Sequence, residues 1–274
     1  MMWASLADYA YLQHALVAAI LTSIVCGFIG TIVMEKKMIM LSGGVAHAAF
    51  GGIGLSYLAG FSPMLGALLF SVTSSVGIGR INRDSKGNTD VLIGLLWSMG
   101  MALGILFISF MDGYPPDLTT YLFGNILTVP GSEVKAMVII TLLVTGTILL
   151  FYNAYKIFLL DEEFAKVQGI KSTWLEYILF ILLGLAIVVL IQVVGFLLIF
   201  ALVTSPPASA KFFTKKLGHM ITLATAFCLV FTVGGLWISY SFDIPSGATI
   251  ILLSGLSYFL CYSIYLLKTK WKRT

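Results

Sequence analysis

Nine long apolar runs, separated by short stretches of charged and turn-forming residues, constrain this chain more than any other feature. They lie at about 12–34, 38–60, 63–79, 91–110, 134–152, 175–191, 193–210, 219–238 and 248–267. About 20 residues of α-helix cross the ~30 Å hydrocarbon core of a bilayer, so most runs have roughly the length of one crossing. With 59% hydrophobic and 10% charged residues, the composition excludes a water-soluble globular protein. The sequence therefore predicts a polytopic membrane protein.

Helix is expected for each run, because lipid cannot satisfy free backbone groups and the alternation of a membrane β-barrel is absent from the sequence. We predict an all-α fold of about nine transmembrane helices, with eight possible, in a single transmembrane domain over residues 1–274. The count depends on 175–210, whose 36 residues extend at most about 54 Å as helix, too little for two full crossings. We expect a broken or short helical hairpin there, turning near Gln192 to Gly195. Broken helices often line transport paths.

Basic residues cluster at every second boundary between the runs. Placing these boundaries in the cytoplasm satisfies the positive-inside rule for 15 of the 16 Lys and Arg residues, Lys135 being the exception. The N-terminus is then outside and the C-terminus cytoplasmic, in a multi-pass protein of the cell (plasma) membrane. The longest segments between runs are 112–133 on the extracellular side and 156–174 on the cytoplasmic side.

The cytoplasmic segment 156–174 has features of a short surface helix. Asp161, Glu162 and Glu163 place acids where a helix start favours them, and Gly169 follows where the helix would end. An ordinary solvated loop is the alternative.

His47 lies in the middle of the second run. An ionisable side chain at bilayer depth is costly and is by default a functional candidate, and imidazole is a common ligand for transition metals. The alternative is a neutral histidine that is hydrogen-bonded to a neighbouring helix. The surrounding Gly43, Gly44, Gly51 and Gly52 are typical of close helix packing.

Patterns for bond-making chemistry are absent from the sequence, which has no Walker-type phosphate loop, no His-Glu-x-x-His and no Cys-x-x-Cys. Cys26, Cys228 and Cys261 are isolated within apolar runs, and we interpret them as small buried hydrophobic residues. We therefore do not expect an enzyme, a bound cofactor or a nucleic-acid partner.

Several stretches together resemble the membrane permease subunits of zinc, manganese and iron ABC importers. They keep the order and spacing of that family across nearly the whole chain, and they are residues 42–60, 161–169, 194–210 and 235–248, with 121–127 as a fifth. Each alone is a weak signal, and jointly they are strong.

The resemblance implies a homodimeric permease that works with separate cytoplasmic ATPase subunits and an extracellular metal-binding protein. A divalent transition metal ion would then be the cargo, and ATP hydrolysis would lie outside this chain. The resemblance also matches one segment to the coupling helix that docks on the ATPase, namely Asp161, Glu162, Glu163, Phe164, Ala165, Val167 and Gly169.

One position departs from the family pattern. Members commonly carry an Asp four residues before the pathway histidine, and here that residue is Gly43. His47 then offers nitrogen without a neighbouring carboxylate, which favours zinc over manganese or iron. A permease for a chelated metal cofactor or siderophore and a stand-alone cation carrier are the alternative functions.

Overall fold

The computed structural model describes residues 9–84, 89–111, 124 and 126–271, and every regular element among them is a helix. The long helices are α2 (Ala10–Glu35), α3 (Ile39–Ala59), α4 (Pro63–Asp84), α5 (Thr89–Ser109), α7 (Gly131–Leu150), α10 (Ser172–Val194), α11 (Phe196–Lys211), α12 (Leu217–Phe242) and α13 (Ser246–Trp271). The short ones are η1 (Ile126–Thr128), α8 (Tyr152–Leu160) and α9 (Glu162–Val167). Most of the expected extracellular segment, 112–123 and 125, lies outside the described residues.

Eight of these helices are long and apolar enough to cross a membrane. The remaining apolar run, 193–210, forms α11, whose 16 residues span only about 24 Å. This confirms the prediction of an all-α polytopic protein with eight or nine crossings, and α11 is the reason for the ambiguity.

The hairpin between α10 and α11 is broken at Gly195, inside the predicted range. Gly195 has φ 78° and ψ 161°, a conformation that essentially only glycine adopts. Gly124 packs against this break, because a Cβ placed on Gly124 would lie 2.2 Å from the carbonyl carbon of Val194. Two segments far apart in the sequence therefore meet backbone to backbone where the helix is interrupted.

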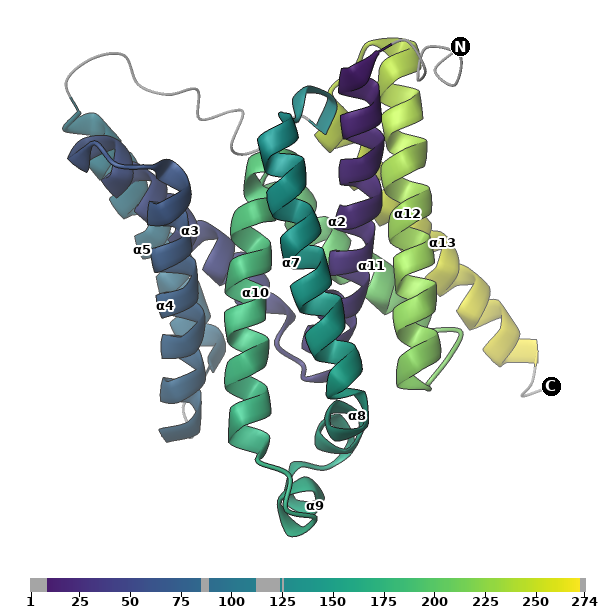
Figure 1. Cartoon of the computed structure of the whole chain (residues 1–274). Coiled ribbons are helices and arrows are strands. Elements are labelled where there is room, and N and C mark those ends of the chain that lie inside the picture. The colour runs from purple at the N-terminus through teal and green to yellow at the C-terminus, as the bar shows by residue number, and fades with distance from the viewer. Residues whose placement is uncertain (1–8, 85–88, 112–123, 125, 272–274) are drawn as a thin grey trace.

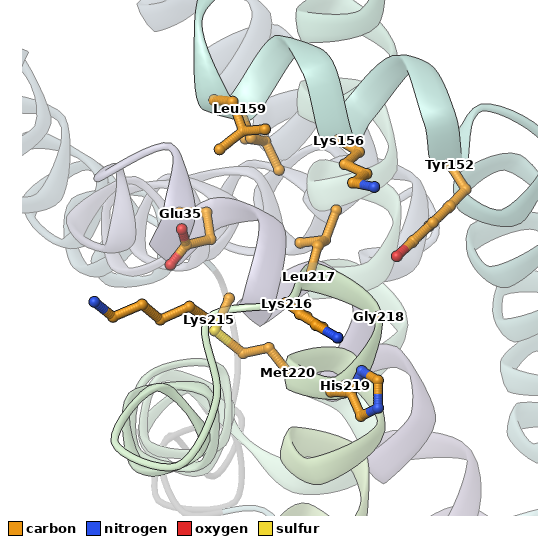
Figure 2. A pocket seen from close by; sticks show the side chains of 11 residues that line it. Glu35, Tyr152, Lys156, Leu159, Lys215, Lys216, Leu217, Gly218, His219 and Met220 are labelled. Atoms are coloured by element: carbon orange, nitrogen blue, oxygen red, sulfur yellow. The ribbon is translucent and has the colours of Figure 1, made fainter.

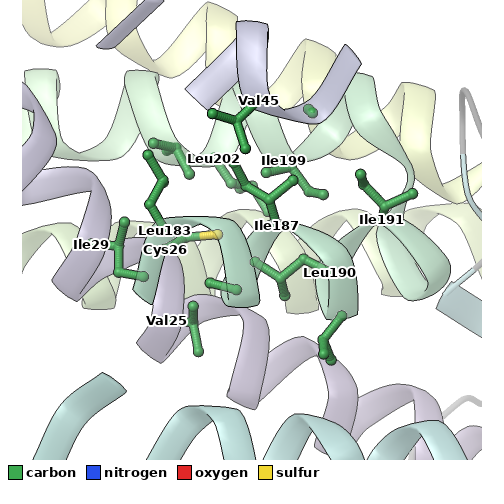
Figure 3. Packing of buried hydrophobic residues seen from close by; sticks show 14 of the residues in the cluster. Val25, Cys26, Ile29, Val45, Leu183, Ile187, Leu190, Ile191, Ile199 and Leu202 are labelled. Atoms are coloured by element: carbon green, nitrogen blue, oxygen red, sulfur yellow. The ribbon is translucent and has the colours of Figure 1, made fainter. Parts of the chain in front are cut away.

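The core lies where α2, α3, α10 and α11 converge (Figure 3). Cys26 of α2, Val45 of α3, Ile187 of α10 and Leu202 of α11 are among the buried residues that fill it. The cysteine thus serves as a small apolar side chain, as its isolation in the sequence indicated.

The short helices α8 and α9 lie together at one end of the bundle, opposite the start of α2 (Figure 1). The chain between α11 and α12, which carries Lys215 and Lys216, returns at the same end as α8 and α9. By the positive-inside rule this basic end is cytoplasmic. The last helix of the chain, α13, is inclined relative to the others and largely exposed, as a lipid-facing helix would be (Figure 1).

Candidate functional site

His47 is buried in the middle of α3 with an aromatic ring on either side. Its imidazole is 8% exposed and stacks on Trp97 of α5, with ring centroids 4.4 Å apart and planes inclined by 20°. The ring of Phe196 lies 5.6 Å away. Phe196 is the first residue of α11, so the break at Gly195 brings an aromatic side chain up to the histidine.

One nitrogen of this imidazole lacks a protein partner. The Nδ1 atom is buried and finds no hydrogen bond within the described part of the chain. Buried polar atoms are almost always satisfied, and the exceptions include atoms whose partner is an ion or a water molecule. Among the described residues, Nδ1 of His47 therefore makes no hydrogen bond to a neighbouring helix, as the structural alternative for this histidine would require.

Gly43 lies one helical turn before His47 and faces the same tryptophan. A Cβ on Gly43 would lie 2.7 Å from Cζ3 of Trp97 and 3.3 Å from the ring of Phe200. A larger side chain at this position requires the tryptophan to move. The indole therefore fills the space into which an acidic side chain at position 43 would extend.

The position of α3 is set by close backbone approaches to α4 and α5. A Cβ on Gly52 would lie 2.0 Å from the carbonyl oxygen of Gly66, and one on Gly51 would lie 3.1 Å from that of Gly100. A Cβ on Gly44 would meet Ile93 at 2.8 Å. Small residues of this kind let membrane helices pack tightly, so the backbone that carries His47 is held on two sides.

Among the described residues, no three or more His, Cys, Asp or Glu side chains gather closely enough to hold a metal ion. Within that part of the chain His47 therefore offers a single nitrogen ligand, without a surrounding cage.

The cytoplasmic segment 156–174 contains the short helix α9, which is capped at both ends. Asp161 Oδ1 accepts hydrogen bonds from the backbone N–H groups of Glu163 at 2.9 Å and Phe164 at 3.0 Å. At the other end Gly169 has φ 79°, and its N–H donates to the carbonyl oxygen of Lys166 at 3.0 Å. The N–H of Ile170 donates to Ala165, which completes a Schellman cap.

Large apolar side chains are exposed on α9 and just before it. Ala165 is fully buried, but Phe164 is 52% exposed and Val167 is 85% exposed. Leu160, just before the helix, is 80% exposed. Three large apolar side chains thus face away from the protein, outside the membrane-spanning segments.

A network of ion pairs connects α9 to the ends of three membrane helices. Glu162 pairs with Lys36 at 3.1 Å, Arg83 at 3.4 Å and Lys166 at 3.2 Å. Glu176 of α10 pairs with Lys36 at 3.2 Å and also with Arg83. Lys36 follows α2, and Arg83 lies in the last turn of α4.

Glu176 is the most deeply buried member of this network. Its side chain is 4% exposed, whereas those of Lys36 and Arg83 are 17% and 23% exposed. Burial raises the pKa of Glu162, but hydrogen bonds and the charges of Lys36 and Lys166 outweigh it and hold the pKa below its ordinary value. The Glu162 carboxylate is therefore ionised at neutral pH and pairs with these cations.

The sequence did not predict the residues that surround His47 or that pair in the ion network, which are Trp97, Phe196, Lys36, Arg83 and Glu176. Glu176 carried a usable signal, because it is the only acidic residue within the apolar run 175–191. The others had no such signal, since a tryptophan in an apolar run and basic residues at membrane edges are ordinary in membrane proteins.

The fold and these sites define a multi-pass permease of the plasma membrane. Residues 8–265 match the model of the ABC 3 transport family, and the chain belongs to this family. It is 35% identical over 257 residues to the manganese transport system membrane protein MntC of Listeria monocytogenes, with 94% of this chain and 91% of MntC covered. It is 31% identical over 246 residues to a probable iron transport system membrane protein of Haemophilus influenzae, with 90% of each covered.

A solved structure supports the same assignment. The chain is similar to PsaBC from Streptococcus pneumoniae in complex with Fab, with a TM-score of 0.85 and 31% sequence identity over 95% of this chain and 94% of that one. These matches confirm the resemblance drawn from the sequence and the all-α permease fold.

Proposed function

We propose that this chain is the permease subunit of an ATP-driven importer for a divalent transition metal ion, with His47 as a transient ligand on the pathway. The buried imidazole of His47, whose Nδ1 has no hydrogen-bond partner among the described residues, is the observation that carries this proposal. Membership of the ABC 3 transport family supports ATP-driven transport, and the names of the manganese and iron relatives support a metal cargo. The metal is then the substrate, and the chain needs no cofactor of its own.

Ligand chemistry favours zinc at the membrane step. Gly43 supplies no carboxylate, and Trp97 fills the space where one would extend, so nitrogen is the donor that this part of the pathway offers. Zinc accepts imidazole readily, whereas manganese prefers carboxylate oxygen. Manganese is the second candidate, because several relatives are named as manganese permeases.

We propose three protein partners. A second copy of the chain would bring a second His47, and an extracellular metal-binding protein would deliver the ion. A separate ATPase subunit would hydrolyse ATP and dock on α9, where the exposed Phe164 and Val167 offer an apolar contact. An apolar anchor of this kind is typical of protein interfaces.

Metal uptake into proteoliposomes that contain the permease, its ATPase and its binding protein tests the proposal. We expect His47→Ala to lower the rate of zinc uptake about tenfold, as losses in the ligand environment of metal sites do. His14→Ala is the matched control, because His14 lies only half-buried near the start of α2. If the His47→Ala variant took up zinc at the wild-type rate, His47 would not be a ligand on the transport pathway.

The same assay separates the alternative functions. Uptake that proceeds at the full rate without ATP would indicate a stand-alone cation carrier. Uptake of a metal chelate, with no uptake of the free ion, would indicate a permease for a chelated cofactor or siderophore. Competition between zinc and manganese in the wild-type complex would decide between the two metals.

A further inference from the structure

A basic cavity opens at the cytoplasmic end of the bundle, between α8 and the start of α12 and beside the end of α2 (Figure 2). Its volume is about 450 Å³, within the range of small-ligand sites. The charged residues that line it are Lys156, Lys215, Lys216 and Glu35. Glu35 is already paired with Lys211 at 2.6 Å, so the three lysines leave an excess of positive charge.

The first turn of α12 adds hydrogen-bond donors to this cavity. The N-cap residue Lys216 makes no side-chain cap, and the first N–H groups of a helix have no intrahelical acceptor. The hydroxyl of Tyr152 lies against the same turn, because a Cβ on Gly218 would be 2.7 Å from that oxygen. Lysines, a hydroxyl and free amides at the start of a 26-residue helix are a combination that attracts a phosphate group.

An apolar groove continues from the cavity toward the membrane. It has a volume of about 400 Å³, shares Tyr152, Gly218 and His219 with the basic cavity, and is lined further on by Phe28, Leu149 and Ile221. The lining thus changes from lysines in α8 and before α12 to mainly apolar side chains, with Thr222, one turn into α12. A free phosphate or a nucleotide has no hydrocarbon chain to bury in this groove, whereas a phospholipid has an acyl chain that can lie along it.

We propose that this cavity and groove together bind an anionic phospholipid of the cytoplasmic leaflet, with its phosphate near Lys156 and Lys216, Lys215 adding positive charge to the cavity, and one acyl chain along the groove (Figure 2). Basic pockets between membrane helices on the cytoplasmic side are typical binding sites for anionic headgroups. The lipid would bridge α8 and α12, and α8 leads directly into α9. The site is thus separate from His47 and independent of the metal that the permease carries.

Lipid titration of the full-length permease in detergent, followed by native mass spectrometry, tests the proposal. The probes are dioleoyl-phosphatidylglycerol, dioleoyl-phosphatidylcholine, a short-chain phosphatidylglycerol and inorganic phosphate. We expect the wild-type protein to retain the long-chain anionic lipid most strongly. Comparable binding of phosphatidylcholine would overturn the charge argument, and comparable binding of inorganic phosphate or the short-chain lipid would overturn the role of the groove.

The triple variant Lys156→Gln/Lys215→Gln/Lys216→Gln should bind the anionic lipid about 100-fold more weakly, from the loss of three lysines near an anionic headgroup. The matched control is Lys37→Gln/Lys171→Gln/Lys268→Gln, which removes the same charge from exposed positions elsewhere on the cytoplasmic end. Lys156→Arg/Lys215→Arg/Lys216→Arg should retain binding and shows that the site tolerates substitution.

Equal losses in the two Gln triples would mean unspecific charge attraction and would overturn the site. The ATPase subunit supplies the remaining test, since this surface faces the cytoplasm. If the first Gln triple keeps its lipid but no longer co-purifies with the ATPase, the lysines serve protein docking and the lipid proposal is wrong.

Discussion

The indole of Trp97, on α5, occupies the space in which a side chain on Gly43 of α3 would begin. The same indole stacks on His47, one turn further along α3. The residue type at position 43 therefore affects where the aromatic ring beside His47 lies and, for the function proposed above, which ligands the pathway would offer.

Introducing the missing acid should fail unless the tryptophan is made smaller. We expect Gly43→Asp alone to destabilise the permease by about 1–3 kcal/mol, the usual effect of overpacking. Gly43→Asp/Trp97→Ala should cost less than the sum of the two single variants, because the Asp then occupies space that the indole has left. It should also increase manganese transport more than zinc transport, because oxygen is the harder ligand. Thermal unfolding and metal uptake of both single variants and the double variant measure the coupling. Equal gains for the two metals would contradict the ligand argument.

Removing the aromatic anchor of α9 should release the ATPase. We expect Phe164→Ala to weaken the permease–ATPase complex by roughly 2 kcal/mol, about 30-fold in affinity, because exposed aromatic residues often dominate an interface. Phe213→Ala is the control, since Phe213 is similarly exposed at the cytoplasmic end but lies outside α9. Co-purification and ATP hydrolysis report the effect. An intact complex in the Phe164 variant would place the docking contact elsewhere.

The buried carboxylate of the network should matter more than an exposed one. Glu176→Gln leaves Lys36 and Arg83 without their buried partner, and we expect a loss of about 3 kcal/mol in stability. Glu35→Gln breaks the more exposed pair with Lys211 and should lose less than about 1 kcal/mol. Thermal unfolding compares the two variants. A similar small shift in both would mean that the buried pairs of Glu176 stabilise the fold no more than a surface pair does.

Acid should weaken the attachment of α9 through Glu162. Its pKa is lowered in the folded protein, so its contribution to stability is complete above the ordinary value of 4.5 and is lost as the pH falls through the lower folded value. We therefore expect the wild-type protein to be more stable than Glu162→Gln at pH 7 and the difference to shrink below about pH 4.5. Unfolding midpoints of both proteins across this range measure it. A constant difference would exclude Glu162 as the titrating group.

Much of the fold follows from the sequence because the bilayer reduces folding to a few rules. The lengths of the apolar runs predict the helices, and the shortage of residues in 175–210 predicts the break that the structure places at Gly195. The caps of α9 are equally local, since Asp161 and Gly169 act on their immediate neighbours.

The surroundings of the candidate sites could not be predicted in this way. Trp97 reaches His47 only through the packing of α3 on α5, and Glu176 meets Arg83 across 93 residues of sequence. Neither spacing nor composition encodes such contacts. They depend on which faces of the helices turn toward one another, and most of these helices are apolar on all sides.

Glu176 also bears on how the protein is made. Synthesis runs from the N-terminus, so Lys36 and Arg83, which the positive-inside rule places on the cytoplasmic side, are made before Glu176. The Glu176 carboxylate can then pair with Lys36 and Arg83, so it need not enter an apolar environment as an unpaired charge. The charge partners of α10 are thus supplied by the ends of two helices that precede it in the chain, α2 and α4.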